Sequence, residues 1–201
     1  MTPATRGALL VACAAIVAGL TSLPAGFVHD DHRLIEENET IRDLAHPLRI
    51  VTQGYWTVDE RQVPNLWRPV TILSFAVNRA LLGEGPLGFR VVDLLLHAMA
   101  CVLVFLLARQ VFAAGGVEQA GSGGDGGFGA PLLAGLLFAV HPIHSEALGL
   151  VVGRAEILAA IGAVGAVLLF LAAVTHVERG DRRGALLIQG AALAAFAFGF
   201  L

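Results

Sequence analysis

The sequence FRVVDLLLHAMACVLVFLLARQVF, residues Phe89 to Phe112, has the length and composition of a membrane-spanning helix. About 20 apolar residues in a helix cross the ~30 Å hydrocarbon layer of a bilayer. Arg90, Asp93 and His97 interrupt its first half at spacings of three and four, which places them on one face of a helix. Ionisable side chains at membrane depth face protein or water, so we expect these three to point inward, where they would form a packing network.

Apolar segments of similar character fill most of the remaining chain. Of its 201 residues, 56% are hydrophobic and 14% are charged, whereas soluble proteins carry about 25% charged residues. Residues 7–28, residues 157–174 and the stretch from Gly184 onward are apolar, and residues 130–153 form a further run that polar residues interrupt. We therefore predict an all-α, polytopic membrane protein with about five transmembrane helices in a lipid bilayer.

The charged residues exclude several classes of function. The net charge is −3 and the sequence pI is about 6.1, so the composition gives no indication of nucleic-acid binding. All 13 basic residues are arginine. A chain without lysine has neither the lysine of a Walker-A phosphate loop nor a Schiff-base lysine.

A long polar loop, 29–85, separates the first two apolar helices. It carries six Arg, nine Asp or Glu and both Trp of the chain. The loop is too long for a simple connector, and its pattern predicts short helices over 31–48 and 69–82, the second lying along the membrane surface. We therefore divide the chain into a first transmembrane helix (1–28), an outer loop and the further transmembrane helices (86–201).

Charge asymmetry predicts the orientation in the membrane. Arg6 precedes the first apolar run, whereas Asp30 and Asp31 follow it, and a basic cluster at 179–183 follows the fourth run. Positive charge close to the ends of apolar helices favours the cytoplasmic side. We expect a cell-membrane protein with a cytoplasmic N-terminus, an outer polar loop, and a flexible glycine-rich cytoplasmic linker at 113–129.

Two adjacent carboxylates follow the first apolar run. Asp30 and Asp31 would lie at the outer membrane surface, where a fixed carboxylate can act as a general base towards an acceptor hydroxyl. The second carboxylate can orient the first or hold a divalent cation. The alternative is a solvated flank of the helix without chemistry.

The motif HPIHSE interrupts the apolar run 130–153. Burying His141, His144 and Glu146 in lipid would be costly, so these residues indicate a cavity. Pro142 is expected to break or kink the helix at the same place. Because His-x-x-His lacks the i, i+4 spacing of a helical zinc motif, we assign no metal to it.

Two arginines are candidates for binding a phosphate group. Arg154 lies in the motif GRAE at the outer end of an apolar helix, and Arg68 follows a tryptophan in the outer loop. A guanidinium binds phosphate oxygens through paired N–H groups. The alternatives are an internal ion pair of Arg154 with Glu146 or Glu156 and, for Arg68, a side chain that reaches to the membrane interface.

Several motifs occur in an informative order and spacing. They are FVHDD (Phe27–Asp31), WRPVTILSF (Trp67–Phe75), PLGF (Pro86–Phe89), FAVHPIHSEA (Phe138–Ala147) and VVGRAE (Val151–Glu156). With them the chain resembles, from about residue 27 to residue 171, the N-terminal membrane part of the transmembrane and tetratricopeptide-repeat O-mannosyltransferases and their bacterial relatives. HPIHSEA followed by VVGRAE is the most specific part of this resemblance.

The resemblance implies a GT-C type glycosyltransferase, with a multi-spanning helical fold, a polyprenyl-phosphate sugar donor and an acidic catalytic motif in the first outer loop. Asp30 and Asp31 match that motif. The related eukaryotic enzymes transfer mannose to Ser or Thr of secreted proteins, so the expected acceptor is a hydroxyl group, with Ser or Thr of an exported protein as the candidate. We accordingly assign the donor phosphate to Arg68 and Arg154, and the donor cavity to His141, His144, Glu146 and Glu156.

A competing interpretation is a non-enzymatic membrane anchor or assembly module for C-terminal repeats. It accounts for the apolar helices and for a last apolar run still open at Leu201, after which we expect a C-terminal remainder. It does not account for the ionisable groups within otherwise apolar helices. A transporter would use such groups as a pathway, but no inverted repeat is visible in the sequence.

Overall fold

The computed structural model describes residues 1–42, 44–56, 66–115 and 129–200, and every regular element in these ranges is helical. The predicted all-α class is therefore confirmed. The α-helices are α1 (Pro3–Gly19), α2 (Pro47–Thr52), α3 (Pro69–Leu82), α4 (Pro86–Ala114), α6 (Gly129–Val140), α7 (His144–Gly149), α8 (Arg154–Glu178) and α9 (Arg182–Phe200). The short 3-10 or π turns are η1 (Leu20–Ser22), η2 (His32–Glu36), η3 (Glu39–Arg42) and η4 (Val151–Gly153).

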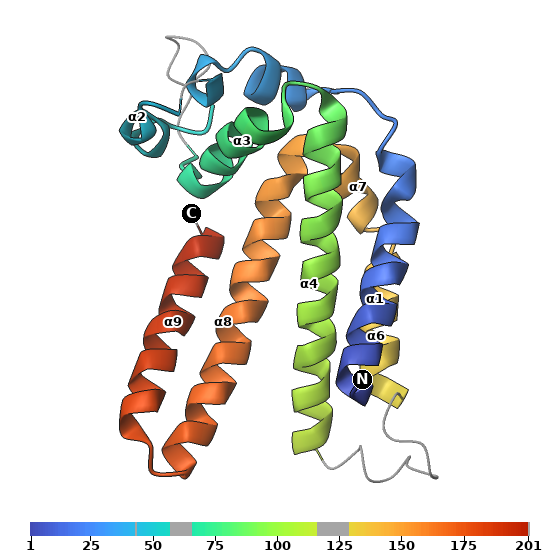
Figure 1. Ribbon diagram of the computed structural model, residues 1–201, viewed down its shortest axis with the longest axis vertical. Coiled ribbons are helices and arrows are strands. Elements are labelled where there is room, and N and C mark those ends of the chain that lie inside the picture. The colour runs from blue at the N-terminus through green and yellow to red at the C-terminus, as the bar shows by residue number, and fades with distance from the viewer. Residues whose placement is uncertain (43, 57–65, 116–128, 201) are drawn as a thin grey trace.

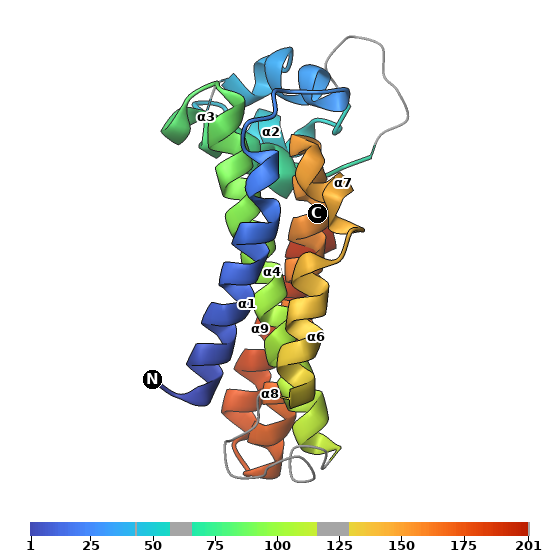
Figure 2. The ribbon, with the colours of Figure 1, turned by 90° about the vertical axis from the view of Figure 1, so that its right-hand side faces the viewer.

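The long helices run along the molecule, and the described residues between α1 and α4 form a cap at one end. Figure 1 shows α1, α4, α6, α8 and α9 along the long axis, with α2 and α3 near the upper end. α4 packs against α1, α6 and α8, and α9 packs against α8 (Figure 2). The N-terminus and the turn between α8 and α9 therefore lie at the end opposite the cap (Figure 1).

Within the described ranges, four stretches are long and apolar enough to cross a membrane, which makes the chain a multi-pass membrane protein. They are Pro3–Ser22, Pro86–Ala114, Val151–Glu178 and Arg182–Phe200. They correspond to four of the five predicted apolar segments.

The fifth predicted segment, 130–153, is divided in two. α6 ends at Val140, and α7 begins at His144 after a turn through Pro142. The 12 residues of α6 extend about 18 Å, which is less than the hydrocarbon thickness. The predicted break at Pro142 is confirmed. The helix breaks here because the proline ring has no N–H group for the helical ladder.

The first helix is shifted towards the N-terminus relative to the predicted run 7–28. Thr2 caps it by accepting a hydrogen bond from the N–H of Thr5, and Pro3 occupies its first turn. Helical structure ends at Ser22, two residues before Pro24, which has no N–H group to continue the helical ladder. The chain can therefore cross the end of the bundle before the paired aspartates.

The cap has its own hydrophobic core, which continues into the bundle. The predicted helix over 69–82 is confirmed as α3. Phe89 of α4 and Val151 of η4 pack with the cap residues, so the cap and the ends of the spanning helices are one packed unit. The buried members are Leu34, Ile35, Ile41, Ile50, Tyr55, Ile72, Phe75, Ala76, Phe89 and Val151.

A second hydrophobic core lies between α1, α4 and α6. It includes Phe105, and Gly7 packs against the ring of Phe105 and Gly135 against its Cβ, at distances that leave no room for a larger residue. Small residues at such contacts let membrane helices approach closely. Most of the predicted glycine-rich linker at 113–129 lies outside the described residues; α4 continues to Ala114.

Candidate functional site

Asp31 is a buried anchor between the chain that leaves α1 and the start of α8. Its side chain is fully buried, and its two carboxylate oxygens accept backbone N–H groups from Val28 (3.2 Å) and Val152 (3.0 Å). The loop turns sharply here, because His29 adopts a positive φ of 49°. Asp31 therefore ties the loop after α1 to η4.

Asp30 differs from its neighbour, because its side chain is exposed on the cap. The fixed position of Asp31 holds the backbone of Asp30 as well. The structure thus separates the predicted pair into one carboxylate that is held within the protein and one that can meet a ligand.

Arg68 lies over the ring of Tyr55, a residue that the sequence analysis did not select. The guanidinium carbon is 5.5 Å from the ring centroid, a distance at which a cation is attracted to the face of an aromatic ring. Burial raises the pKa of Tyr55 to about 12, although Arg68 acts in the opposite direction. The charges of Asp30 and Asp31 also act on this phenol and raise its pKa, so Tyr55 lies near the aspartates as well as near Arg68. Its only sequence signal is that it is the single tyrosine of the chain.

A cavity of about 590 Å³ opens between the cap and the ends of α8 and α9. Arg68 and Glu156, both selected from the sequence, line it. Most of the remaining wall is apolar and includes Leu66, Trp67, Ala155, Leu158, Ala159, Phe198 and Phe200. The cavity combines one cation and one carboxylate with walls that suit a hydrocarbon.

Arg154 is fully buried and engaged within the protein. Its Nε donates to Asp93 Oδ1 (2.5 Å), and its terminal nitrogens donate to the side chains of Asn78 and Ser74 and to the carbonyls of Phe89 and Ser74. These contacts occupy all five N–H groups of a guanidinium. In this structure Arg154 has no N–H group left for the predicted contact with the phosphate of the sugar donor. The ion-pair partner of Arg154 is Asp93, whereas the sequence analysis had considered Glu146 and Glu156.

Arg90, Asp93 and His97 are buried, as their spacing on one face of the helix predicted. Arg90 donates to four backbone carbonyls, those of Ala25 and Gly26 after α1 and those of Leu148 and Gly149 in α7. One guanidinium therefore joins α4, the exit of α1 and the end of α7. We did not foresee these partners, since backbone carbonyls leave no signal in a sequence.

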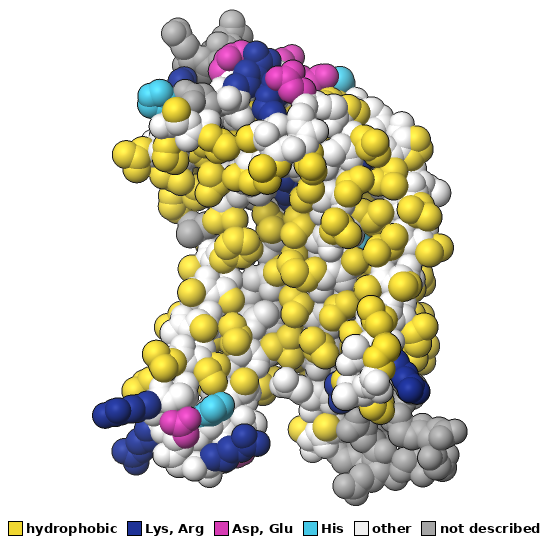
Figure 3. All heavy atoms as spheres, in the orientation of Figure 1, with side chains coloured by type: hydrophobic (Ala, Val, Ile, Leu, Met, Phe, Trp, Pro, Cys, Tyr) yellow, Lys and Arg dark blue, Asp and Glu magenta, His cyan; other side chains and the backbone are white. Residues whose placement is uncertain are grey.

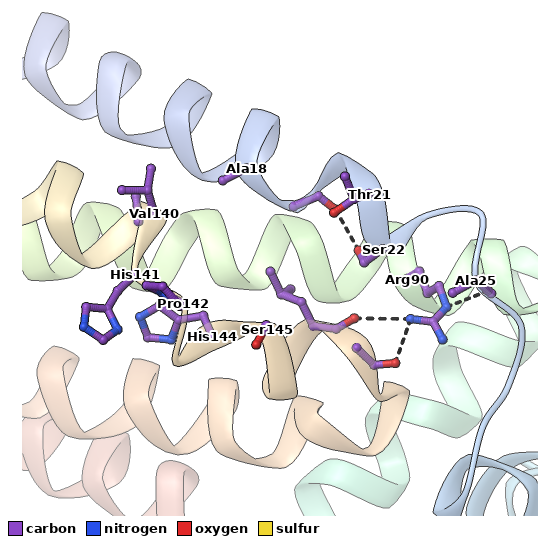
Figure 4. A pocket seen from close by; sticks show the side chains of 14 residues that line it. Ala18, Thr21, Ser22, Ala25, Arg90, Val140, His141, Pro142, His144 and Ser145 are labelled. Atoms are coloured by element: carbon purple, nitrogen blue, oxygen red, sulfur yellow. Dashed lines mark hydrogen bonds between the residues drawn. The ribbon is translucent and has the colours of Figure 1, made fainter.

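His141 and His144 line a second cavity, of about 350 Å³, between the end of α1 and the junction of α6 with α7 (Figure 4). Arg90 and Ser145 also line it. The His144 ring packs against Phe138, with ring centroids 4.4 Å apart, and its buried Nε2 has no hydrogen-bond partner in the described part of the chain.

The predicted donor cavity is thus divided. Glu156 lies with Arg68, the two histidines line the second cavity, and Glu146 is exposed and lines neither. Over the residues that the structure describes, no three His, Cys, Asp or Glu side chains gather as a metal-binding group. Asp30 and Asp31 are accordingly not part of a larger ligand cluster there.

These features define a multi-pass, all-α membrane protein with a folded polar cap and a cation-bearing cavity beneath it. Its sequence is similar to curated protein O-mannosyl-transferases. It is 40% identical over 153 residues to Tmtc1 of Drosophila melanogaster, 37% over 187 residues to Tmtc2 of the same organism, and 34% over 189 residues to TMTC1 of Homo sapiens.

These matches cover most of this chain but a small part of the relatives. They include 74%, 89% and 92% of this chain, and 16%, 18% and 19% of the respective relatives. The resemblance predicted from the motifs is therefore confirmed: over most of its length the chain is related to the TMTC protein O-mannosyl-transferases. No protein-family model and no solved structure matches the chain.

Proposed function

We propose that this chain is part of a membrane glycosyltransferase that transfers a sugar from a polyprenyl-phosphate donor to a hydroxyl group of a protein. The names of the relatives supply mannose as the sugar and a protein as the acceptor. The observation that carries the proposal is the cavity beneath the cap, in which Arg68 accompanies apolar walls. A phosphate carried on an apolar chain needs both features in one place.

Arg68 is the proposed phosphate ligand. The ring contact with Tyr55 orients the guanidinium, and a contact of this kind uses none of its N–H groups. Leu158 and Phe198 would contact the first part of the polyprenyl chain, and Glu156 would accept hydrogen bonds from sugar hydroxyls. Arg154 and Glu146 have no part in this donor site, and the histidine cavity is separate from it.

Asp30 is the proposed general base. Its exposed carboxylate takes the proton of the acceptor hydroxyl while the oxygen forms a bond to the anomeric carbon. The bond from that carbon to the phosphate oxygen breaks, and its electron pair leaves on the phosphate. Arg68 stabilises the charge that develops there. Asp31 acts as a positioning residue, because it fixes the loop that carries Asp30.

The proposed orientation has the cap outside the cell and the N-terminus in the cytoplasm. Arg6 at the N-terminal end, Arg109 near the end of α4 and the arginines around the α8–α9 turn lie away from the cap, and Figure 3 shows basic side chains gathered at that end. Positive charge of this kind favours the cytoplasmic side. The acceptor would then be Ser or Thr of an exported protein.

The proposal is tested with the full-length protein and a polyprenyl-phosphate mannose donor. Asp30→Asn should lower the rate of transfer to a Ser/Thr peptide about 100-fold or more, which is the usual contribution of a general base. Glu37→Gln, which removes another exposed cap carboxylate, should leave the rate unchanged. Normal transfer by Asp30→Asn would remove Asp30 from the mechanism, and no transfer by the unaltered protein would count against the activity itself.

A further inference from the structure

Helix α3 has two faces of different character. One face is buried in the cap core through Ile72, Phe75 and Ala76. The other face exposes large aliphatic side chains: Val77 is 40% exposed, Leu81 76% and Leu82 54%. Val77 and Leu81, four residues apart, lie on the side of the helix that the cap leaves uncovered, and Leu82 follows at the end of the helix.

This exposed face continues onto the membrane-spanning helix α4. Leu82 contacts the first turn of α4, where a Cβ added to Gly88 would lie 3.0 Å from the Cβ of Leu82. The adjoining side of α4 exposes Leu87 (58%) and Val91 (37%), one turn apart. This row of exposed apolar side chains continues along α4 with Leu95 and Met99, each four residues further on. Because these apolar residues are exposed on a helix long enough to span a membrane, they form a side that faces lipid.

The charged residues of the cap lie elsewhere. Figure 3 shows acidic and basic side chains gathered at the top of the cap, with hydrophobic side chains below them over α3 and down α4. Close to the boundary, Arg79 turns back to pair with Glu84 and to donate to the carbonyl of Ile35. A polar side above an apolar side is the arrangement of a helix that lies in a membrane interface.

We propose that α3 is an interfacial helix, with Val77, Leu81 and Leu82 inserted among lipid chains beside Leu87. The occupant of this face is lipid, because the face is continuous with the apolar surface of α4 and carries no charge of its own. α3 begins directly after Arg68, so its insertion holds that guanidinium at the level of the lipid headgroups. This last step rests on the proposed function, whereas the position of α3 does not.

The test measures which reagent reaches the face of α3. A nitroxide is attached through a ketone-bearing unnatural residue at Leu81 of the full-length protein in lipid nanodiscs, so that native cysteines stay in place. Collisions with oxygen, which concentrates in lipid, and with a water-soluble nickel chelate are compared. Labels at Leu95 and Glu37 provide the lipid and water references.

A label at Leu81 should behave like that at Leu95, with frequent collisions with oxygen and few with nickel. Frequent nickel collisions, as at Glu37, would overturn the proposal in favour of water. Few collisions with either reagent would overturn it in favour of another protein segment over this face. The same measurement at Val77, one turn earlier, decides the matter if the first variant does not fold. None of these outcomes depends on transferase activity.

Discussion

Asp93 on α4 and Arg154 at the start of α8 form an ion pair in which both side chains are almost completely buried. The Arg154 guanidinium also lies 4.8 Å from the ring centroid of Phe75 in the cap. The pair therefore joins two spanning helices to the cap at one point. Such a pair is not a measure of stability in itself, because burying both charges is costly, but losing one partner leaves the other charge uncompensated.

Replacing Arg154 by alanine is expected to destabilise the protein by about 3–5 kcal/mol, because the Asp93 carboxylate stays buried without its partner. Arg154→Lys should cost less, because lysine keeps a positive charge beside Asp93. Some stability is still lost, because lysine offers three N–H groups in place of five. Thermal unfolding in nanodiscs measures both. Arg42→Ala, which removes an exposed pair with Glu39, is the control and should cost less than about 1 kcal/mol. A fully stable Arg154→Ala protein with weakened donor binding would restore the phosphate role.

Asp31→Asn should affect stability more than Asp30→Asn does. An asparagine at position 31 keeps one acceptor oxygen but turns an NH₂ group towards the N–H of either Val28 or Val152. One backbone N–H then lacks an acceptor, at a cost of about 1–3 kcal/mol. The two variants are compared by unfolding and by transfer rate per folded molecule. If Asp31→Asn unfolds like the unaltered protein, the anchor role is wrong.

The sequence could predict features that depend on one helix alone. The spacing of Arg90, Asp93 and His97 placed them inward, and Pro142 marked the break between α6 and α7. The partner of Arg154 could not be found in this way, because Asp93 lies 61 residues earlier and meets it only through the packing of α4 on α8. Spacing had offered only the nearby glutamates.

The candidate site required tertiary contacts that the sequence does not encode in a readable pattern. Asp30 and Asp31 look equivalent as neighbours, and the contact of Asp31 with the backbone of Val152, 121 residues away, could not be found from the sequence. Arg68 and Glu156 were both selected, but their common cavity depends on α9 closing one side of it. Tyr55 was missed because a tyrosine beside Trp56 in a polar loop usually indicates packing alone.

Tyr55 predicts a loss of stability at alkaline pH. Its folded-state pKa of about 12 is above the ordinary value of 10.0, so the folded protein holds the phenolic proton more tightly than the unfolded chain does. The resulting stabilisation is complete below pH 10 and is lost as the pH rises from 10 to 12. Tyr55→Phe should flatten this part of the stability curve, measured by denaturant unfolding between pH 8 and pH 12. An unchanged slope in Tyr55→Phe would assign it to other groups.

The proposed orientation predicts the location of the glycine-rich segment. A reporter inserted at Gly123 follows α4, which runs away from the cap, and should read cytoplasmic, whereas one inserted at Gln53 in the cap should read external. Paired alkaline phosphatase and fluorescent-protein fusions measure this in a bacterial host, since each reporter is active on one side of the membrane only. A reversed pattern would place the cap in the cytoplasm and exclude an exported acceptor.

The contact between α8 and α9 should be sensitive at Gly162 and tolerant at Gly165, although both glycines lie on α8. A Cβ at Gly162 would lie 2.4 Å from the Cα of Gly199 on α9, whereas a Cβ at Gly165 meets nothing within 4 Å. Gly162→Val is expected to push α9 away, to cost about 1–3 kcal/mol of stability, and to weaken donor binding because Phe198 belongs to the displaced wall. Gly165→Ala should be neutral or stabilising by up to about 1 kcal/mol, because alanine is the better helix former.

Unfolding and donor titration of the two variants measure both effects. If Gly162→Val binds the donor normally after losing stability, α9 does not form a wall of the donor cavity.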